Sequence, residues 1–208
     1  MDLSLFRLPS KKEIEPFKID HSLPKTIEEV EKRMLSHLLN VTLSKEIIMV
    51  CIGSDRSTGD CLGPLVGSQL KSISSSVPVY GTLEDPIHAV NLEDKLNMIH
   101  QQHPHSYIIA IDACLGQISS IGHIIIGQGP IKPGAGVKKK LPPVGHMHIT
   151  GVVNVAGFME IFVLQNTRLH LVINIANVIS ESLIRVIHQL KRSTPSYTSE
   201  ILDHETQT

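Results

Sequence analysis

Two aspartates in this chain, Asp60 and Asp112, each follow an apolar run that predicts a buried strand. Asp60 comes after the run 47–52 and the small, polar turn 53–59, at the point where a helix is expected to begin. Asp112 comes directly after the run 107–111. Ligands of open α/β sheets bind beyond the carboxyl ends of the strands. Two carboxyl groups at that edge can act as acid and base on one water molecule, or they can hold a divalent metal ion.

Each aspartate also has a purely structural interpretation. An Asp at a helix start satisfies free backbone N–H groups, which would explain Asp60, and an Asx turn or a cap would explain Asp112. Asp112 is harder to explain in this way, because a carboxylate at the edge of the core needs a partner, a metal ion or a proton. We therefore predict that the two side chains converge at the carboxyl edge of one sheet, close enough to share a proton, a water molecule or an ion.

A pair of histidines supplies candidate metal ligands. His146 and His148 are two residues apart in Gly-His-Met-His-Ile-Thr-Gly, so a strand would place both rings on one face. Imidazole together with carboxylates suits zinc, nickel or manganese better than calcium, which prefers oxygen ligands alone. The predicted metal site consists of Asp60, Asp112 and His148, with His146 as a substitute. Because the chain has 12 histidines, a chance pair of polar histidines is the alternative.

Two further segments contain candidate substrate-binding residues. Glu84 follows the short apolar run 77–80 and is expected at the same sheet edge, unless it belongs to a solvated turn before Pro86. The segment 133–140 combines glycines with lysines, so its backbone could support an extended substrate or bind an anion, although it lacks the order of a GxxxxGK[ST] phosphate loop. A solvated loop is the alternative there. The candidate substrate-binding residues are Glu84, Gly134, Gly136 and Lys138.

The hydrophobic pattern predicts alternating strands and helices. The predicted strands cover 46–52, 77–80, 106–111, 121–126 and 168–175. The predicted helices cover 26–39, 60–74, 91–102, 151–165 and 177–191. Thr26 and Glu29 are typical of a capping box at the first helix, and the segment 127–143, rich in Gly, Pro and Lys, is predicted as a long loop.

This alternation predicts an α/β fold, a three-layer αβα sandwich around a mostly parallel central sheet. The strand at 121–126 is expected to pair beside the strand at 106–111. The length of 208 residues fits one domain. We expect an N-terminal arm over 1–24, a single αβα domain over 25–192 and a flexible tail over 193–208.

Composition excludes several classes of function. With 41% hydrophobic and 19% charged residues, the chain is typical of a soluble globular protein. A formal net charge of −1 and 3% aromatic residues argue against a nucleic-acid partner. The longest charge-free stretch, 141–159, is too rich in Pro, Gly and polar residues for a membrane span. Three scattered cysteines, including Cys61 and Cys114 beside the aspartates, are interpreted as packing residues in a reducing cytoplasm.

Three segments resemble, in the same order, motifs of the germination protease of spore-forming bacteria. Ile52–Val66 resembles the first motif, which also ends in Asp, a small residue, Leu, Gly and Pro. Ile109–Ala113 resembles the second motif, and Ile131–Val137 resembles a Pro-Gly-(small)-Gly-Val segment. Together they span about 50–155, and their joint occurrence is more specific than any one motif. A smaller family of sporulation proteins, often labelled as a spore protease, also resembles the chain, and the hydrogenase-maturation endopeptidase is a more distant likeness.

The resemblance implies a sporulation-associated peptidase-like hydrolase whose two acids fall on Asp60 and Asp112. The hydrogenase-maturation endopeptidase adds a metal-binding His that opens a helix as His-x-x-Gly, and this His falls on His148, with Gly151 three residues later. The resemblance also implies a protein or peptide substrate and a location in the cytoplasm of the cell, the forespore or the spore. It leaves homo-oligomer formation open.

Two other functions stay open. The first is a catalytically inactive binding or scaffold protein of sporulation that keeps the protease fold. The second is a hydrolase of a small substrate with a phosphate or an amide, in which Lys138 to Lys140 would contact an anion. For a peptidase, the aspartates alone do not decide between an aspartic-type mechanism, in which they share a proton, and a metal-assisted one.

Overall fold

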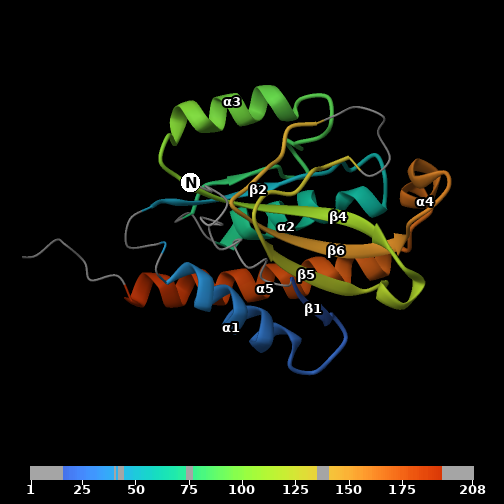
Figure 1. Cartoon of the computed structure of the whole chain (residues 1–208), viewed down its shortest axis with the longest axis horizontal. Coiled ribbons are helices and arrows are strands. Elements are labelled where there is room, and N and C mark those ends of the chain that lie inside the picture. The colour runs from blue at the N-terminus through green and yellow to red at the C-terminus, as the bar shows by residue number, and fades with distance from the viewer. Residues whose placement is uncertain (1–15, 40, 42–44, 74–76, 135–140, 194–208) are drawn as a thin grey trace, which may run out of the picture.

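The computed structural model describes residues 16–39, 41, 45–73, 77–134 and 141–193. Six strands form one mixed sheet in the order β1-β5-β6-β4-β2-β3 (Figure 1). Their bounds are β1 Phe17–Asp20, β2 Ile47–Cys51, β3 Val79–Tyr80, β4 Tyr107–Gly116, β5 His123–Gln128 and β6 Met147–Val155. The pairings from β3 through β2 and β4 to β6 are parallel, and those from β6 through β5 to β1 are antiparallel.

Helices cover both faces of the sheet, which confirms the predicted three-layer αβα sandwich. The helices are α1 Thr26–Leu38, α2 Leu62–Ile73, α3 Leu92–Gln102, α4 Glu160–Gln165 and α5 Leu169–Ser193, with short 3-10 turns η1 Gly59–Cys61 and η2 Ile118–Ser120. Buried residues of α1, α2 and α5 share one core, and those of α3 belong to a second core. Figure 1 shows α3 on one side of the sheet and α1 and α5 on the other.

The alternation of side chains along β4 determines which face carries Asp112. Ile109 and Ile111 point into the core beneath α1, α2 and α5, whereas Ile108 and Ala110 point into the core beneath α3. Asp112 continues the second series, because residues two apart share a face of a strand. It therefore lies on the α3 face. The sequence suggested that Asp112 follows the strand. In the structure it lies within β4, where it pairs with Thr150 of β6.

Two predicted elements are wrong, and they are neighbours in the chain. Of the segment predicted as a helix over 151–165, residues 151–155 form the second half of β6, a strand whose β-branched residues favour extended backbone, and only 160–165 are helical, as α4. The segment predicted as a strand over 168–175 lies in α5, where buried residues recur at helical spacing over a much longer stretch. Because β6 lies between β4 and β5, the strand at 123–128 does not pair beside β4 as predicted.

Smaller differences occur at the N-terminal side. Residues 17–20 of the predicted arm form β1, an edge strand of the sheet. Thr26 is the first residue of α1 and does not cap it, because its hydroxyl donates to the Asp20 carbonyl oxygen at 2.6 Å. This hydrogen bond fixes α1 to the strand before it. The rest of the predicted arm, residues 1–15, and nearly all of the predicted tail, residues 194–208, lie outside the described residues.

Two glycines, one in the first motif and one just after it, allow α2 to lie against backbone. A Cβ on Gly63 would be 2.1 Å from the Ile52 carbonyl oxygen, and one on Gly67 would be 2.0 Å from the Gly81 carbonyl oxygen. No side chain fits at either position, since real Cβ atoms essentially never approach backbone this closely. Gly63 thus brings the helix after Asp60 into direct contact with the end of β2, and Gly67 brings it against the residue that follows β3.

Among the described residues, one helix, α5, is long and apolar enough to cross a membrane by length and composition. Half of that apolar window is buried inside the fold. Its buried residues, including Val172, Ile175, Ile179, Leu183 and Val186, belong to the core shared with α1 and α2. The apolar character of α5 is therefore explained by its place as the central helix of one layer.

Candidate active site

A pocket of about 180 Å³ at the carboxyl edge of β2 and β4 contains both aspartates. This volume is enough for several water molecules or one amino-acid side chain. The described residues that line it are Ile52, Gly53, Ser57, Asp60, His88, Ala89, Asp112, Ala113, Pro133, Gly134, Leu141, Ile161 and Leu164. The structure thus brings together the two acids that the sequence singled out. Their catalytic role stays a prediction.

The turn between β2 and α2 holds Asp60 at the pocket. Gly53 has a φ of 141°, and a Cβ there would lie 1.9 Å from the Asp60 carbonyl oxygen, so the turn requires glycine. The Ser54 N–H closes the turn by donating to that oxygen at 3.0 Å. Burial raises the pKa of the Asp60 carboxyl group, and the nearby charge of His88 acts in the opposite direction.

Asp112 is the more buried acid, with 7% of its surface exposed. Its Oδ1 accepts a hydrogen bond from the Ala113 N–H at 2.8 Å. Burial raises the pKa of Asp112 well above its usual range, the negative charge of Asp60 raises it further, and the Ala113 N–H opposes both effects. Asp112 is therefore the acid of the pair that holds its proton more strongly, while Asp60 ionises more readily.

His88 is a pocket residue that the sequence analysis did not select. Ile87 forms a bridge with Ile52, and its carbonyl oxygen accepts a hydrogen bond from the Gly53 N–H at 2.7 Å, so His88 is fixed beside the end of β2. The Val90 backbone nitrogen lies 3.3 Å from His88 Nδ1. His88 stands four residues after Glu84, and its place in the pocket depends on the bridge between Ile87 and Ile52, which the local sequence pattern does not reveal.

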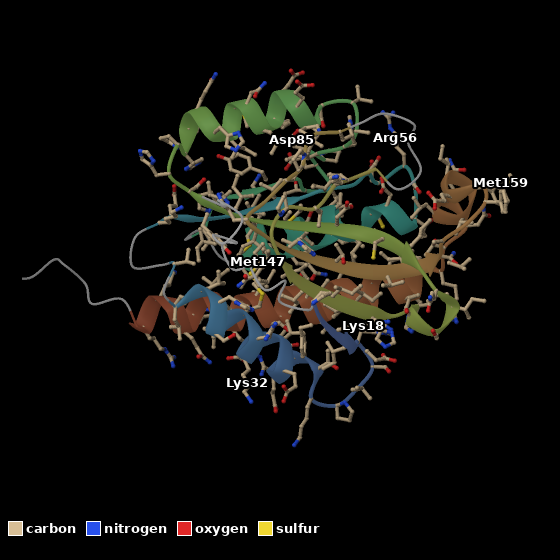
Figure 2. All side chains as sticks on the ribbon, viewed as in Figure 1. Lys18, Lys32, Arg56, Asp85, Met147 and Met159 are labelled. Carbon is tan, nitrogen blue, oxygen red and sulfur yellow. The ribbon has the colours of Figure 1, made fainter. Side chains whose placement is uncertain are left out.

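The predicted substrate-binding residues fall in different places. Gly134 lines the pocket. Glu84 is exposed and is absent from the described lining of the pocket. Its neighbour Asp85 pairs instead with Lys95 of α3 at 2.6 Å, and Figure 2 shows Asp85 beneath that helix. Gly136 and Lys138 lie outside the described residues.

The two predicted histidine ligands do not line the pocket. His148 lies in β6, where its Nδ1 is 2.9 Å from the Gly129 carbonyl oxygen and its ring covers Gly127 of β5. The helix that a His-x-x-Gly motif would open is absent there, because residues 147–155 form a strand. His146 lies at the other end of β4, where its ring stacks on Tyr107 and its Nδ1 accepts from the Ile108 N–H at 3.0 Å.

The predicted metal ligands are therefore not assembled in this arrangement. Within the part of the chain that the structure describes, no three His, Cys, Asp or Glu side chains are grouped so that they could hold a metal ion. The donor set as it stands does not fit a metal ion, so we derive no chemical step through one. Metal binding stays a prediction for experiment.

Neighbouring hydroxyl and thiol groups complete the site. The Ser57 hydroxyl is buried, lines the pocket and has no hydrogen-bond partner in the structure, so it has unused bonding capacity. Cys61 donates from its thiol to the Thr58 carbonyl oxygen at 2.9 Å. Burial raises the pKa of both Cys61 and Cys114, which suits packing residues better than thiolate nucleophiles.

The fold and the pocket define a class: an αβα protein with a pair of carboxyl groups at the carboxyl edge of its sheet. The chain belongs to the family described as "Protein of unknown function (DUF1256)", whose model matches residues 18–182. A relative from Bacillus subtilis (strain 168), described as "Uncharacterized protein YyaC", is 60% identical over 151 residues. The match covers 72% of this chain and 74% of the relative.

Among solved structures, the chain is similar to the [NiFe] hydrogenase maturation protease HycI from Thermococcus kodakarensis KOD1. The two share 19% sequence identity with a TM-score of 0.48, and the match covers 73% of this chain and 98% of the other. The likeness to the germination protease stays a prediction from the three sequence motifs.

Proposed function

We propose that this chain is a peptidase-like hydrolase in which Asp60 and Asp112 act together on one water molecule. The observation that carries the proposal is that both carboxyl groups line one pocket, with the pKa of Asp112 raised by burial and by the charge of Asp60. Hydrolysis by a shared-proton pair needs two acids of unequal proton affinity in this relation. The three sequence motifs that resemble the germination protease favour a peptide bond as the substrate.

In the proposed reaction Asp60 begins ionised and Asp112 begins protonated. Asp60 takes a proton from water as the water oxygen attacks the carbonyl carbon of the substrate, and Asp112 donates its proton to the carbonyl oxygen. The intermediate then collapses. The C–N bond breaks, the leaving nitrogen takes the proton from Asp60, and one hydroxyl of the intermediate returns a proton to Asp112. The products are a carboxylic acid and an amine, and both aspartates regain their starting states.

Two further features support a reactive pocket over an inert one. The Ser57 hydroxyl has an unused hydrogen bond, which the oxygen or nitrogen of a substrate could complete. No Cys or Met is among the described residues that line the pocket, so its space is not filled in the way expected of a binding module that has lost the reaction. A binding or scaffold protein of the same fold is the competing proposal.

Peptide cleavage by wild type and three variants tests the proposal. A mixed peptide library is incubated with the purified protein, and new termini are identified by mass spectrometry. Asp112→Asn and Asp60→Asn should each lower cleavage by about a hundredfold or more, since each removes a proton-transfer group. Asp55→Asn is the matched control, because Asp55 is exposed on the same turn and is absent from the described lining.

Full activity of Asp112→Asn would remove that residue from the mechanism. Peptide binding without cleavage by the wild-type protein would favour the binding module. Circular dichroism of each variant shows whether a loss of cleavage comes from unfolding.

Calorimetry with chelator-stripped protein tests the metal-assisted alternative. If zinc, nickel or manganese binds at Asp60, Asp112 and His148, His148→Ala should weaken binding strongly and His146→Ala less. Binding should also weaken as the pH falls, because a ligating His must be neutral. No heat with any of these ions at neutral pH would leave the acid pair or the binding module.

The proposed setting is the cytoplasm of a sporulating cell, the forespore or the spore, and it rests on the motif resemblance alone. A fluorescent fusion followed through sporulation tests it. The small-substrate hydrolase depends on Lys138 to Lys140, which lie outside the described residues. Hydrolysis of small phosphate or amide compounds without peptide cleavage would favour that reading.

A further inference from the structure

Four bulky apolar side chains lie exposed between β6 and the first turns of α4. They are Phe158, Met159, Ile161 and Phe162, with exposed fractions of 97%, 72%, 55% and 55%, and we call them the apolar lip. Figure 2 shows Met159 at the end of the molecule where α4 lies. The whole chain has only four phenylalanines, so half of them stand in this one exposed segment. Large apolar groups gathered on a surface mark an interaction site.

The apolar lip is joined to the turn that carries Asp60. The short helix α4 packs on η1 and on β6. Its Leu164 contacts the turn so closely that a Cβ on Gly59 would lie 2.9 Å from Leu164 Cδ2. The Asn154 side-chain amide donates to the Val163 carbonyl oxygen at 3.3 Å and to Thr167 Oγ1 at 3.1 Å, which ties the end of α4 to β6.

The backbone at the start of the apolar lip is also unusual. Met159 has a φ of 57°, and it is the only residue other than glycine with a positive φ among the described residues. A non-glycine residue in this region is strained and persists where the surrounding structure requires it. Polar contacts therefore hold the inner side of α4 in place, while its outer apolar side chains lie in solvent.

We infer that the apolar lip binds a bulky apolar side chain of a polypeptide substrate, close to the bond that reaches Asp60 and Asp112. This inference rests on the proposed function. Ile161 and Leu164 line the pocket of the two acids, and Phe158 and Phe162 are exposed on the same segment, so one short segment places apolar side chains both in the pocket and in solvent. A chain that places its backbone at the acids would extend one side chain over this surface.

A substrate segment fits the apolar lip better than a second copy of the chain. Four side chains are far fewer than the roughly 20–30 residues a side of a stable protein–protein interface. An occupant must also reach into the pocket, because Ile161 is shared between the apolar lip and the pocket lining. An extended peptide satisfies both conditions.

Fluorescence anisotropy with labelled heptapeptides tests the inference. The central residue of each peptide is Phe, Leu, Ser or Asp, and the protein carries Asp112→Asn so that no turnover intervenes. The Phe and Leu peptides should bind about tenfold or more tightly than the Ser peptide, since one large apolar side chain leaves water. A double substitution, Phe158→Ser with Phe162→Ser, should remove this preference and leave binding of the Ser peptide unchanged.

Leu23→Ser is the matched control. Leu23 is 54% exposed on the turn after β1, the edge strand at the other side of the sheet, so its loss should keep the preference. If the double variant unfolds by circular dichroism, Phe158→Ser alone carries the test, because this side chain is 97% exposed and has little packing to lose.

Two results would overturn the inference. The first is equal affinity for the four peptides. The second is a wild-type dimer in analytical ultracentrifugation that the double variant converts to monomers, since the apolar lip would then bind a second copy. Apolar preference in the Asp112→Asn protein, combined with no cleavage by wild type, would uphold the apolar lip and refute the proposed hydrolase.

Discussion

The amino and carboxyl edges of the sheet both carry ionisable side chains, but only at the amino edge are these side chains fully hydrogen-bonded to other described residues. At the amino edge, before β2 and β4 begin, His103 Nδ1 lies 2.7 Å from Glu46 Oε2, and its Nε2 lies 2.8 Å from the Tyr80 hydroxyl. At the carboxyl edge, within the described residues, the Asp112 carboxyl group accepts only the Ala113 N–H, and the Ser57 hydroxyl has no partner.

This difference separates structural polar groups from candidate functional ones. Polar groups inside proteins are nearly always hydrogen-bonded, and the amino edge follows that rule by linking α3, β3 and the start of β2. The carboxyl edge keeps two acids with raised pKa values around a pocket. Unused bonding capacity and perturbed proton affinity in a cleft are typical of sites that complete their bonds with a ligand.

The largest expected contrast is in catalysis. Asp60→Asn should lower peptide cleavage by about 10²–10⁴, the usual contribution of a general base. Glu46→Gln should change it by less than about twofold, although it removes the same charge from the other end of β2. Initial rates measured side by side at one pH provide the comparison. Equal losses in the two variants would show that the acids of the carboxyl edge act only through the fold.

The next effect concerns the pH profile. The charge of His88 opposes the rise of the Asp60 pKa, so His88→Gln should raise that pKa. Asp60 would then become ionised only at higher pH. The acid limb of the plot of cleavage rate against pH should therefore shift to higher pH. On that limb the rate should fall by up to about tenfold, whereas above it the rates should converge. An acid limb that does not move would separate His88 from the base.

Asp112→Asn should lower peptide cleavage but raise the stability of the folded chain at high pH. The pKa of Asp112 is higher in the folded chain than in the unfolded one, so this residue stabilises the fold least at high pH. The contribution of Asp112 to the free energy of unfolding is fully present below its pKa in the unfolded chain, near 4. This contribution is lost as the pH rises through the pKa of Asp112 in the folded chain. Asp112→Asn should therefore raise the free energy of unfolding at about pH 8 by roughly 1 kcal/mol, or about 2–4 °C in Tm.

The gain from Asp112→Asn should vanish near pH 4, and thermal melts at both pH values measure it. His103→Ala serves for comparison. It should destabilise the chain by about 1 kcal/mol, because it removes the interactions of the ring with Glu46 and with the Tyr80 hydroxyl. A stabilising His103→Ala would contradict the assignment of that edge to structure.

The smallest effect is expected at Ser57. Its buried hydroxyl has no partner, so Ser57→Ala should raise the free energy of unfolding by about 0.5 kcal/mol. The same variant should weaken binding of a peptide that uses this hydroxyl by a few fold. Chemical denaturation and anisotropy measure the two quantities. A loss of stability would mean that the hydroxyl already has a partner in the folded chain.

Much of the fold follows from local pattern. The apolar run 47–52 predicts β2, and the helical spacing of the buried residues predicts α3, each to within a few residues. This works because one face or both faces of each element are buried. The errors over 151–175 have a different origin. Gly151 looks like a helix start, but it lies in β6, where a Cβ would be 2.6 Å from Leu62 Cδ2 and 2.8 Å from Ile175 Cγ2, so a larger residue would need these side chains to shift. Such a contact between distant segments leaves no local signal.

The site shows the same limit. Asp60 and Asp112 could be predicted because each follows an apolar run, and both runs form buried parts of one sheet. His88 and Ile161 could not be predicted with the same ease, since their positions depend on a bridge between Ile87 and Ile52 and on the packing of α4. The position of His148 could not be predicted from the His-x-x-Gly motif, because the motif does not reveal the strand that turns its ring toward Gly127.

The glycines that seat α2 also bear on how this sequence can diverge. Gly63 and Gly67 are needed for the helix to touch backbone, whether or not any reaction takes place nearby. A descendant that lost the reaction would be free to replace Asp60 but not these glycines. The glycines would then be kept for packing alone. When related sequences are compared, the aspartates rather than the glycines should therefore indicate which proteins still catalyse the reaction.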